Sequence, residues 1–191
     1  MTQVKNEIEG FSLIEVLVSL VILVIGLIGI FNLHIVSKRS SFESFQQTQA
    51  SYYVNDIINR MKLNRTQLNN YNGTFSGALS LPGTSCDVAV NAAAVICTNV
   101  ETRLWDLYQW EQLFGGASEK LSGRDVGGLD TPTACIQAQA NGQVLVVMTW
   151  RGIRRLSDGA ENATGDNASF TKGCGTSGDR RRVYSIDTVI I

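Results

Sequence analysis

The chain has few histidines, prolines and charged residues. Its 191 residues include one histidine, two prolines, 16 Lys+Arg and 17 Asp+Glu. A single histidine, His34, cannot supply the several imidazole ligands of many catalytic metal sites, so a histidine-rich metalloenzyme is excluded. The formal net charge of −1 argues against binding nucleic acid through the net field. A hydrophobic content of 44% excludes a wholly disordered chain, and the length suits one domain with an appendage.

The shortage of charge is concentrated near the start of the chain. Residues 11–36 contain one carboxylate, Glu15, and the single histidine. A helix from Phe11 to Ile35 would rise ~38 Å, enough to cross a bilayer. The apolar run is longer than the core of a cleaved secretory signal, and no small-x-small cleavage site follows it. We therefore expect an uncleaved membrane helix. The alternative is the buried core helix of a soluble domain.

Glu15 stands inside this apolar run. A charged residue within a bilayer costs about 2.5–3.5 kcal/mol on insertion scales, which makes it a candidate functional residue. Because Glu15 lies near one end of the run, the alternative is an interfacial carboxylate that reaches the headgroup region.

The string Gly10-Phe11-Ser12-Leu13-Ile14-Glu15 resembles the processing site of type IV prepilins and pseudopilins. The resemblance implies that a prepilin peptidase cuts after Gly10 and methylates the new amino group of Phe11. It also implies that Glu15 pairs with the amino-terminal charge of a neighbouring subunit during filament assembly. A buried carboxylate without a partner in its own helix can be stabilised by a cation on another chain.

This resemblance divides the chain into three parts. Residues 1–10 are expected to be the leader peptide, 11–36 the transmembrane and filament-core helix, and 37–191 a periplasmic globular head. The protein would lie in the bacterial inner membrane and later in a cell-surface pilus. Lysine and arginine flanking the run, Lys5 before it and Lys38 with Arg39 after it, weakly favour the opposite orientation. We give more weight to the processing motif and to the cysteines.

The helical pattern continues beyond the apolar run. No proline or glycine occurs between Ile30 and Gly73. Apolar residues recur at helical spacing among polar ones, which predicts one helix from Phe11 to Asn64, ~81 Å long. Asp56 and Arg60 stand four apart, and we interpret them as a solvated pair worth a few tenths of a kcal/mol.

The remainder predicts a small α+β head. Residues 71–98 are expected to form a loop, followed by a helix near 99–114 with a capping box at Thr98-Asn99-Val100-Glu101. Gly115 would end this helix. The expected antiparallel strands cover 134–140, 143–150 and 183–191, with a type I′ turn at Asn141-Gly142, a possible fourth strand near Val126 and a long loop over 152–182.

Four cysteines suggest an oxidising compartment. They allow three pairings, of which we favour Cys86–Cys97 as a local clasp and Cys135–Cys174 as a tie between hairpin and long loop. A zinc site is the alternative, but the chain lacks any CxxC pair.

The chain resembles PilV-type minor pilins at residues 56–65, at Asp106, Trp110 and Trp150, and in the order of its cysteines. The resemblance implies a pilin fold, in which the long helix packs on an antiparallel sheet and the head contains disulfides. It also implies a minor pilin at or near the filament tip, which primes assembly and supports adhesion and twitching motility. The implied partners are the prepilin peptidase, other minor and major pilins and a tip adhesin.

Three alternatives stay open. The same fold serves as a type II secretion pseudopilin. The arginine clusters 151–155 and 180–182 could contact phosphates in a DNA-uptake subunit, although interleaved acids make nucleic acid a less favoured partner. Those acids could bind Ca²⁺, but no EF-hand spacing exists. We identify no catalytic constellation, and expect no enzyme activity, cofactor or metal.

Overall fold

The structure is a computed structural model that describes residues 10, 12–87 and 95–191. The chain divides into two compact units, one up to Ser41 and the other from Phe42 to Ile191. A single helix, α1 (Leu13–Leu63), runs through the end of the first unit into the second. Its bounds confirm the predicted long helix, except that Phe11 lies outside the described residues.

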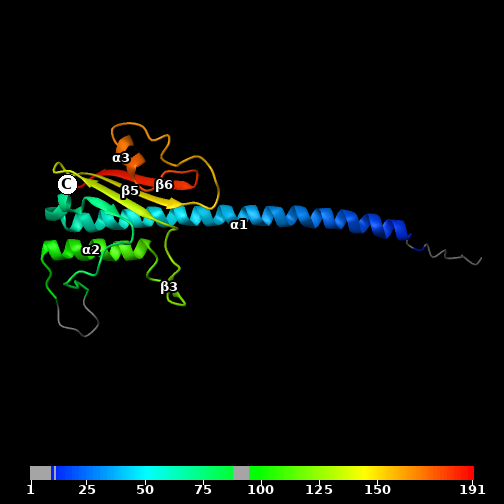
Figure 1. Ribbon diagram of the computed structural model, residues 1–191, viewed down its shortest axis with the longest axis horizontal. Helices are drawn as coiled ribbons and strands as arrows, with labels where there is room; N and C mark the ends of the chain where they lie inside the picture. Colours follow the sequence, from blue (N-terminus) through cyan, green and yellow to red (C-terminus); the bar gives the residue numbers. More distant parts are fainter. Residues whose placement is uncertain (1–9, 11, 88–94) are drawn as a thin grey trace, which may run out of the picture. The chain divides into compact units, whose positions relative to one another are not determined.

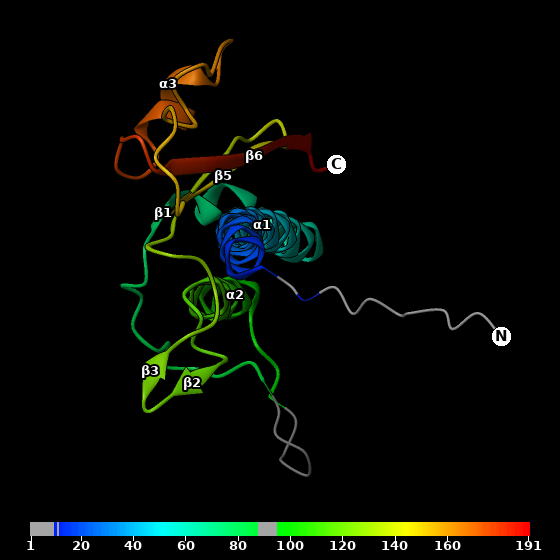
Figure 2. The ribbon, with the colours of Figure 1, turned by 90° about the vertical axis from the view of Figure 1, so that its right-hand side faces the viewer.

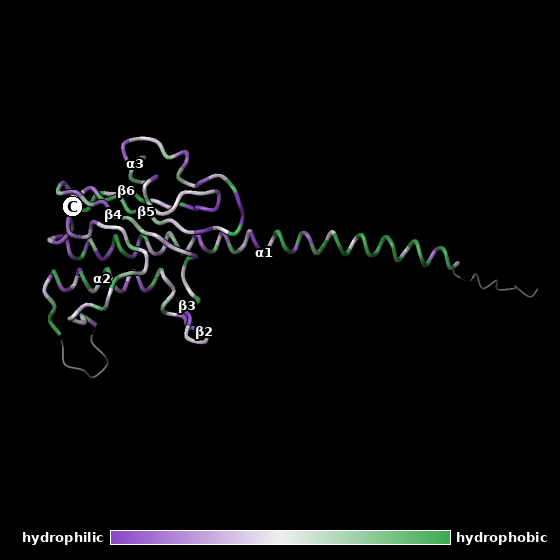
Figure 3. The backbone as a smooth tube through the Cα atoms, in the orientation of Figure 1, coloured by the Kyte–Doolittle hydropathy of each residue, from purple (hydrophilic) through white to green (hydrophobic). Residues whose placement is uncertain are grey.

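The described residues of the first unit are mainly the apolar part of α1, most of which Figure 3 colours as hydrophobic. Every described side chain up to Ser41 is exposed. Within the described part of the chain, α1 is the one helix long and apolar enough to cross a membrane. Exposure of so many leucine, isoleucine and valine side chains to water would be costly, so this surface requires lipid or protein around it.

The second unit contains a four-stranded antiparallel sheet in the order β1–β4–β5–β6. Its strands are β1 (Gly73–Phe75), β4 (Thr133–Ala138), β5 (Gln143–Arg151) and β6 (Arg181–Val189). The part of α1 within this unit lies between the sheet and α2 (Asn99–Phe114) (Figures 1 and 2). A 3₁₀ helix, η1 (Arg65–Tyr71), follows α1, while β2 (Lys120–Leu121) and β3 (Arg124–Asp125) form a separate ribbon.

The main core lies between α1, α2 and one face of the sheet. Trp110 of α2 is fully buried, and its Nε1 donates a 2.8 Å hydrogen bond to the backbone carbonyl of Tyr53. Its ring meets those of Phe75 and Phe114 edge to face, at centroid distances of 5.8 and 4.9 Å. The other face of the sheet is covered by the segment that contains α3 (Ala168–Gly173), where Phe170 packs on a cluster that includes Val147. Strand β5 is therefore buried on both faces, which explains its nearly continuous run of apolar residues.

The capping box that begins α2 is confirmed. The Thr98 hydroxyl accepts the N–H of Glu101, while the Glu101 carboxylate accepts the N–H of Thr98 at 2.8 Å. Hydrogen bonds from the backbone and hydroxyl of Thr98 and from the hydroxyl of Thr84 lower the pKa of Glu101. Both ends of the predicted helix agree with α2, and Gly115 caps it in a right-handed conformation.

Several finer predictions are wrong. The fourth strand is β1, within the region expected to be a loop, whereas residues near Val126 follow the separate ribbon. The turn between β4 and β5 is not type I′, because Gly142 has φ +87° whereas Asn141 does not have a positive φ. Instead Gly142 N donates to the carbonyl of Gln139, so the glycine is the last residue of the turn 139–142. A Cβ at Gly142 would lie 2.5 Å from the carbonyl oxygen of Ile190, so this position requires glycine.

The fold class is confirmed as α+β and pilin-like. A long apolar N-terminal helix packs its second part on an antiparallel sheet, and two disulfides lie in the head. Cys86 is joined to Cys97 and Cys135 to Cys174, the pairing favoured from the sequence.

Candidate functional site

The candidate processing site lies where α1 begins. Gly10 is exposed, and a Cβ added to it would contact nothing within 4 Å. Phe11, predicted to be the first mature and methylated residue, lies outside the described residues. The cleavage and methylation assigned to Gly10 and Phe11 therefore remain predictions.

Ser12 starts the hydrogen-bond ladder of α1. Its backbone carbonyl accepts the N–H of Glu15 at 3.0 Å and that of Val16 at 3.3 Å. Serine is a favoured residue immediately before a helix. The helix thus begins within three residues of the predicted cleavage point.

Glu15 occupies the first turn of α1 and is exposed. The carboxylate makes no ion pair with another residue of the described ranges. The Ser19 hydroxyl donates to the backbone carbonyl of Glu15 at 2.7 Å and not to its carboxylate. The helix macrodipole favours an anion at this end, but that effect is modest compared with the cost of a charge in lipid. The predicted role of Glu15 in assembly needs a cation from another chain.

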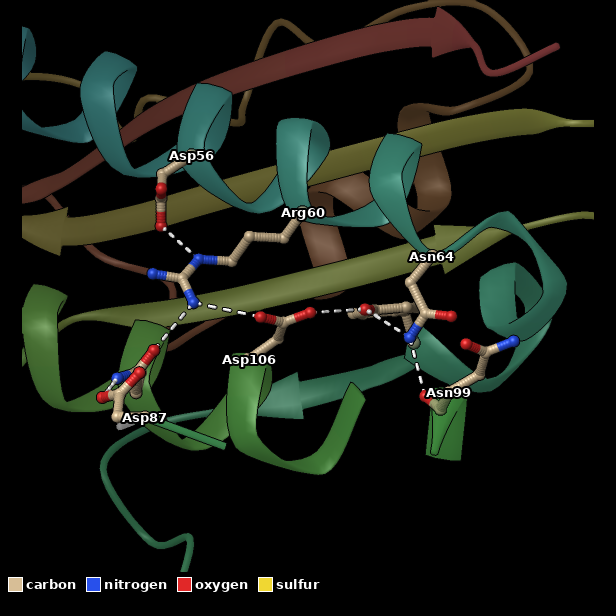
Figure 4. Close-up of polar contacts among 8 residues, drawn as sticks. Asp56, Arg60, Asn64, Asp87, Asn99 and Asp106 are labelled. Atoms are coloured by element: carbon tan, nitrogen blue, oxygen red, sulfur yellow. Dashed lines mark hydrogen bonds and ion pairs between the residues drawn. The ribbon is translucent and has the colours of Figure 1, made fainter. Parts of the chain in front are cut away.

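A polar network joins α1 to α2 in the head (Figure 4). Arg60 Nε donates to Asp56 at 2.9 Å, and its Nη1 donates to Asp106 at 3.1 Å and to Gln109 at 3.0 Å. Burial alone would lower the pKa of Arg60, but Asp56 and Asp106 outweigh it and raise the pKa. The interpretation of Asp56 and Arg60 as a merely solvated pair is wrong, because α2 packs against them and shares the guanidinium.

The same network extends to the end of α1. The Tyr71 hydroxyl donates to the second oxygen of Asp106 at 2.9 Å. Burial, and next the charge of Asp106, raise the pKa of Tyr71. Asn64 Nδ2 donates to the carbonyl of Asn99 at 2.7 Å, as Figure 4 shows. Spacing along the chain gave no signal for these links, since they join residues 35 positions apart.

Glu111 forms a second polar anchor that the sequence did not reveal. It is 1% exposed, and its carboxylate accepts backbone N–H groups from Ser76, Gly77 and Leu79 at 2.7–3.0 Å. A buried carboxylate with three donors is satisfied in place. Glu111 therefore fixes the chain after β1.

The arginine clusters are largely neutralised by acids. Arg181 is 7% exposed and donates to Asp158 at 2.7 Å. Glu43 accepts from the backbone and guanidinium of Arg154, and Arg182 lies 3.6 Å from it. These pairs reduce the positive surface that a DNA backbone would require.

The pKa values of both acids reflect these contacts. Burial alone would raise the pKa of Asp158, but hydrogen bonds from the side chain of Arg181 and the N–H groups of Ala160 and Gly178 lower it overall. Burial likewise opposes the lowered pKa of Glu43, which hydrogen bonds from Arg154 and the charges of Arg154 and Arg182 produce. Among the residues that the structure describes, no group of three or more His, Cys, Asp or Glu side chains is placed to bind a metal ion.

Comparison with known families matches the start of the chain. Residues 6–31 match the Prokaryotic N-terminal methylation motif. This match supports a type IV pilin-like protein. Such a motif implies processing by a prepilin peptidase and assembly with other pilins, and with the apolar helix it suggests membrane anchoring. Comparisons with curated proteins and with solved structures give no match.

Proposed function

We propose that the protein is a minor pilin of the type IV pilus. It helps to prime pilus assembly and is incorporated at or near the filament tip. Residues 1–10 are the leader, 11–36 the membrane and filament-core helix, and 37–191 the periplasmic head. The observation that carries this proposal is the methylation motif over residues 6–31, which includes the start of an exposed apolar helix whose first turn contains Glu15.

The physical sequence of events follows from the charges. In the membrane, the carboxylate of Glu15 is costly, and removal of the leader at Gly10 creates a free amino group on Phe11 of each chain. A carboxylate and an amino-terminal cation from neighbouring chains neutralise each other when helices associate. The apolar surface of the first part of α1 then passes from lipid into contact with other helices, with little change in its hydrophobic environment.

The head supports a structural role. The polar side chains of Arg60, Asp106 and Glu111 form hydrogen bonds with other segments of the head. These bonds hold the elements of the head together. Residues 56–65 resemble the corresponding stretch of PilV-type minor pilins. This resemblance and the four cysteines favour a PilV-type minor pilin over a type II secretion pseudopilin. Its partners would include a prepilin peptidase, other minor and major pilins and a tip adhesin.

Deletion of the gene, with complementation, tests this function. The expected result is a loss of surface pili, twitching and adhesion, while secretion of type II substrates into the medium stays normal. Wild-type chain should restore pili, and the Glu15→Val variant should not. Normal pili with lost secretion would instead establish the pseudopilin alternative.

A further inference from the structure

A cleft on the head is lined by arginine and hydroxyl side chains, of which Arg181 is paired with Asp158 and Thr149 donates to the Thr133 carbonyl. It lies where β4 begins and β5 ends, beside the segment that leads into β6, and has a volume of about 660 Å³. This volume is within the range of about 300–1,000 Å³ typical of small-molecule sites. Among the described residues that line it, Asp179 is the only one with a carboxylate.

Two guanidinium groups in this cleft have no partner among the described residues. Arg151 and Arg180 line the cleft, and neither side chain makes an ion pair or hydrogen bond there. Arg155 has only a weak pair, at 3.6 Å, with the exposed Asp179. The planar fork of arginine matches a carboxylate or sulfate and can bind it with two parallel hydrogen bonds.

Hydroxyl groups surround these charges. The side chains of Ser76, Thr131, Thr133, Thr176 and Ser177 line the cleft, and none forms a side-chain hydrogen bond within the described residues. Hydroxyls both donate and accept hydrogen bonds, as the hydroxyls of a sugar ring do. An arrangement of free hydroxyls around unpaired arginines suits a ligand that has several hydroxyls and one anionic group.

The walls of the cleft are fixed by the fold. Thr131 has φ 45°, a left-handed conformation that is a clear outlier for a β-branched residue and places stored strain at this site. Gly175, with φ +71°, follows Cys174 of the second disulfide, and a Cβ there would lie 2.3 Å from Thr149 Oγ1. Gly178 N donates to the carboxylate of Asp158 at 2.8 Å. These features restrict the backbone conformation of the segments that line the cleft.

We propose that this cleft binds an acidic sugar, a saccharide unit bearing a carboxylate or sulfate group. Arg151 and Arg180 bind the anion, and the hydroxyls bind the ring. Nucleic acid fits less well, because Arg154, Arg181 and Arg182 of the two arginine clusters are paired with acids, which reduces the positive surface that a DNA backbone would require. The proposal is independent of the position of the chain in a filament, and its failure would leave the pilin function standing.

Calorimetric titration of the full-length protein in detergent micelles tests the proposal. The probes are an oligogalacturonate, sialyllactose, a sulfated disaccharide, neutral lactose and a single-stranded oligonucleotide. At least one acidic sugar should bind and neutral lactose should not. Oligogalacturonate and sialyllactose carry a carboxylate, whereas the third probe carries a sulfate. Comparison of their binding shows which anion the cleft binds.

Variants locate the binding. Arg151→Gln and Arg180→Gln should each weaken it about tenfold, the effect expected on loss of a charged hydrogen bond. Arg124→Gln, which changes an exposed arginine outside the cleft, should bind as the wild type does. Circular dichroism of each variant should match the wild type. The proposal is overturned if no acidic sugar binds, if the cleft variants bind unchanged, or if only the oligonucleotide binds.

Discussion

Arg60 on α1 donates a 3.1 Å hydrogen bond to Asp106 on α2, across 46 positions of sequence. Asp106 also accepts from Tyr71, so one carboxylate holds three elements of the head together. Its side chain is 13% exposed, which limits screening by water. The network gives the second part of α1 a fixed partner within the head.

Replacement of Asp106 should destabilise the head more than replacement of Asp56. Asp106→Ala leaves the Tyr71 hydroxyl and part of the Arg60 guanidinium without an acceptor in a half-buried site, at a cost of about 2–4 kcal/mol. Asp56→Ala leaves Arg60 bound to Asp106 and Gln109, and should cost less than about 1 kcal/mol. Urea unfolding of the full protein in detergent, followed by near-ultraviolet circular dichroism, measures both. Equal losses would contradict a central role for Asp106.

The contribution of Asp158 should depend on pH. Because its pKa is lowered in the folded protein, the stability it adds is fully present above its unfolded pKa of about 3.9 and is lost as pH falls through the lower folded value. The difference in unfolding free energy between wild type and Asp158→Asn should therefore be greatest near neutral pH and shrink in acid. Asp179→Asn, at an exposed position, is the control and should show little difference at either pH. A difference in unfolding free energy between wild type and Asp158→Asn that grows as the pH falls would contradict this prediction.

Loss of the second disulfide should cost more than loss of the first. The second disulfide, Cys135–Cys174, joins residues 39 positions apart, whereas the first, Cys86–Cys97, joins residues 11 positions apart. Chain-entropy estimates give about 4 kcal/mol for Cys135–Cys174 and about 3 kcal/mol for Cys86–Cys97. Unfolding of the paired alanine variants, Cys135→Ala/Cys174→Ala and Cys86→Ala/Cys97→Ala, measures the two. The opposite order would contradict the dependence on the length of the closed loop.

Glu15→Val should separate membrane insertion from assembly. Valine removes the charge from the apolar helix, so insertion should be unimpaired or improved, whereas the cation on a neighbouring chain loses its partner. Immunoblots of the inner membrane and of sheared pili should show the variant in the first and not in the second. Ser19→Ala removes only a hydroxyl that contacts the helix backbone, and should enter pili normally. Entry of Glu15→Val into filaments at the wild-type level would contradict the assembly role.

The features that depend on local pattern could be predicted from the sequence. The uncharged run, followed by a stretch without glycine or proline, predicts α1. The Thr98–Glu101 capping box predicts the start of α2. Strand β5 was recognisable from its valines. These signals are local, because they reflect the hydrogen-bond needs and burial of consecutive residues.

Features that depend on tertiary packing could not be predicted. Strand β1 has three residues, and only its pairing with β4 makes it a strand. The bonds of Glu111 to the chain after β1 and of Arg60 to Asp106 join residues that no spacing rule relates. In the sequence, the arginine clusters suggest a basic surface. In the folded head, Glu43 and Asp158 lie next to these arginines and pair with them. The cleft with Arg151 and Arg180 is likewise assembled from separate segments.

Intact-mass and peptide mass spectrometry of the protein isolated from its native membrane tests the central claim most directly. The account predicts a chain that begins at Phe11, carries one methyl group on its amino nitrogen and lacks residues 1–10. A peptide that retains Met1 or is cut elsewhere, or an unmodified amino group on Phe11, would contradict it.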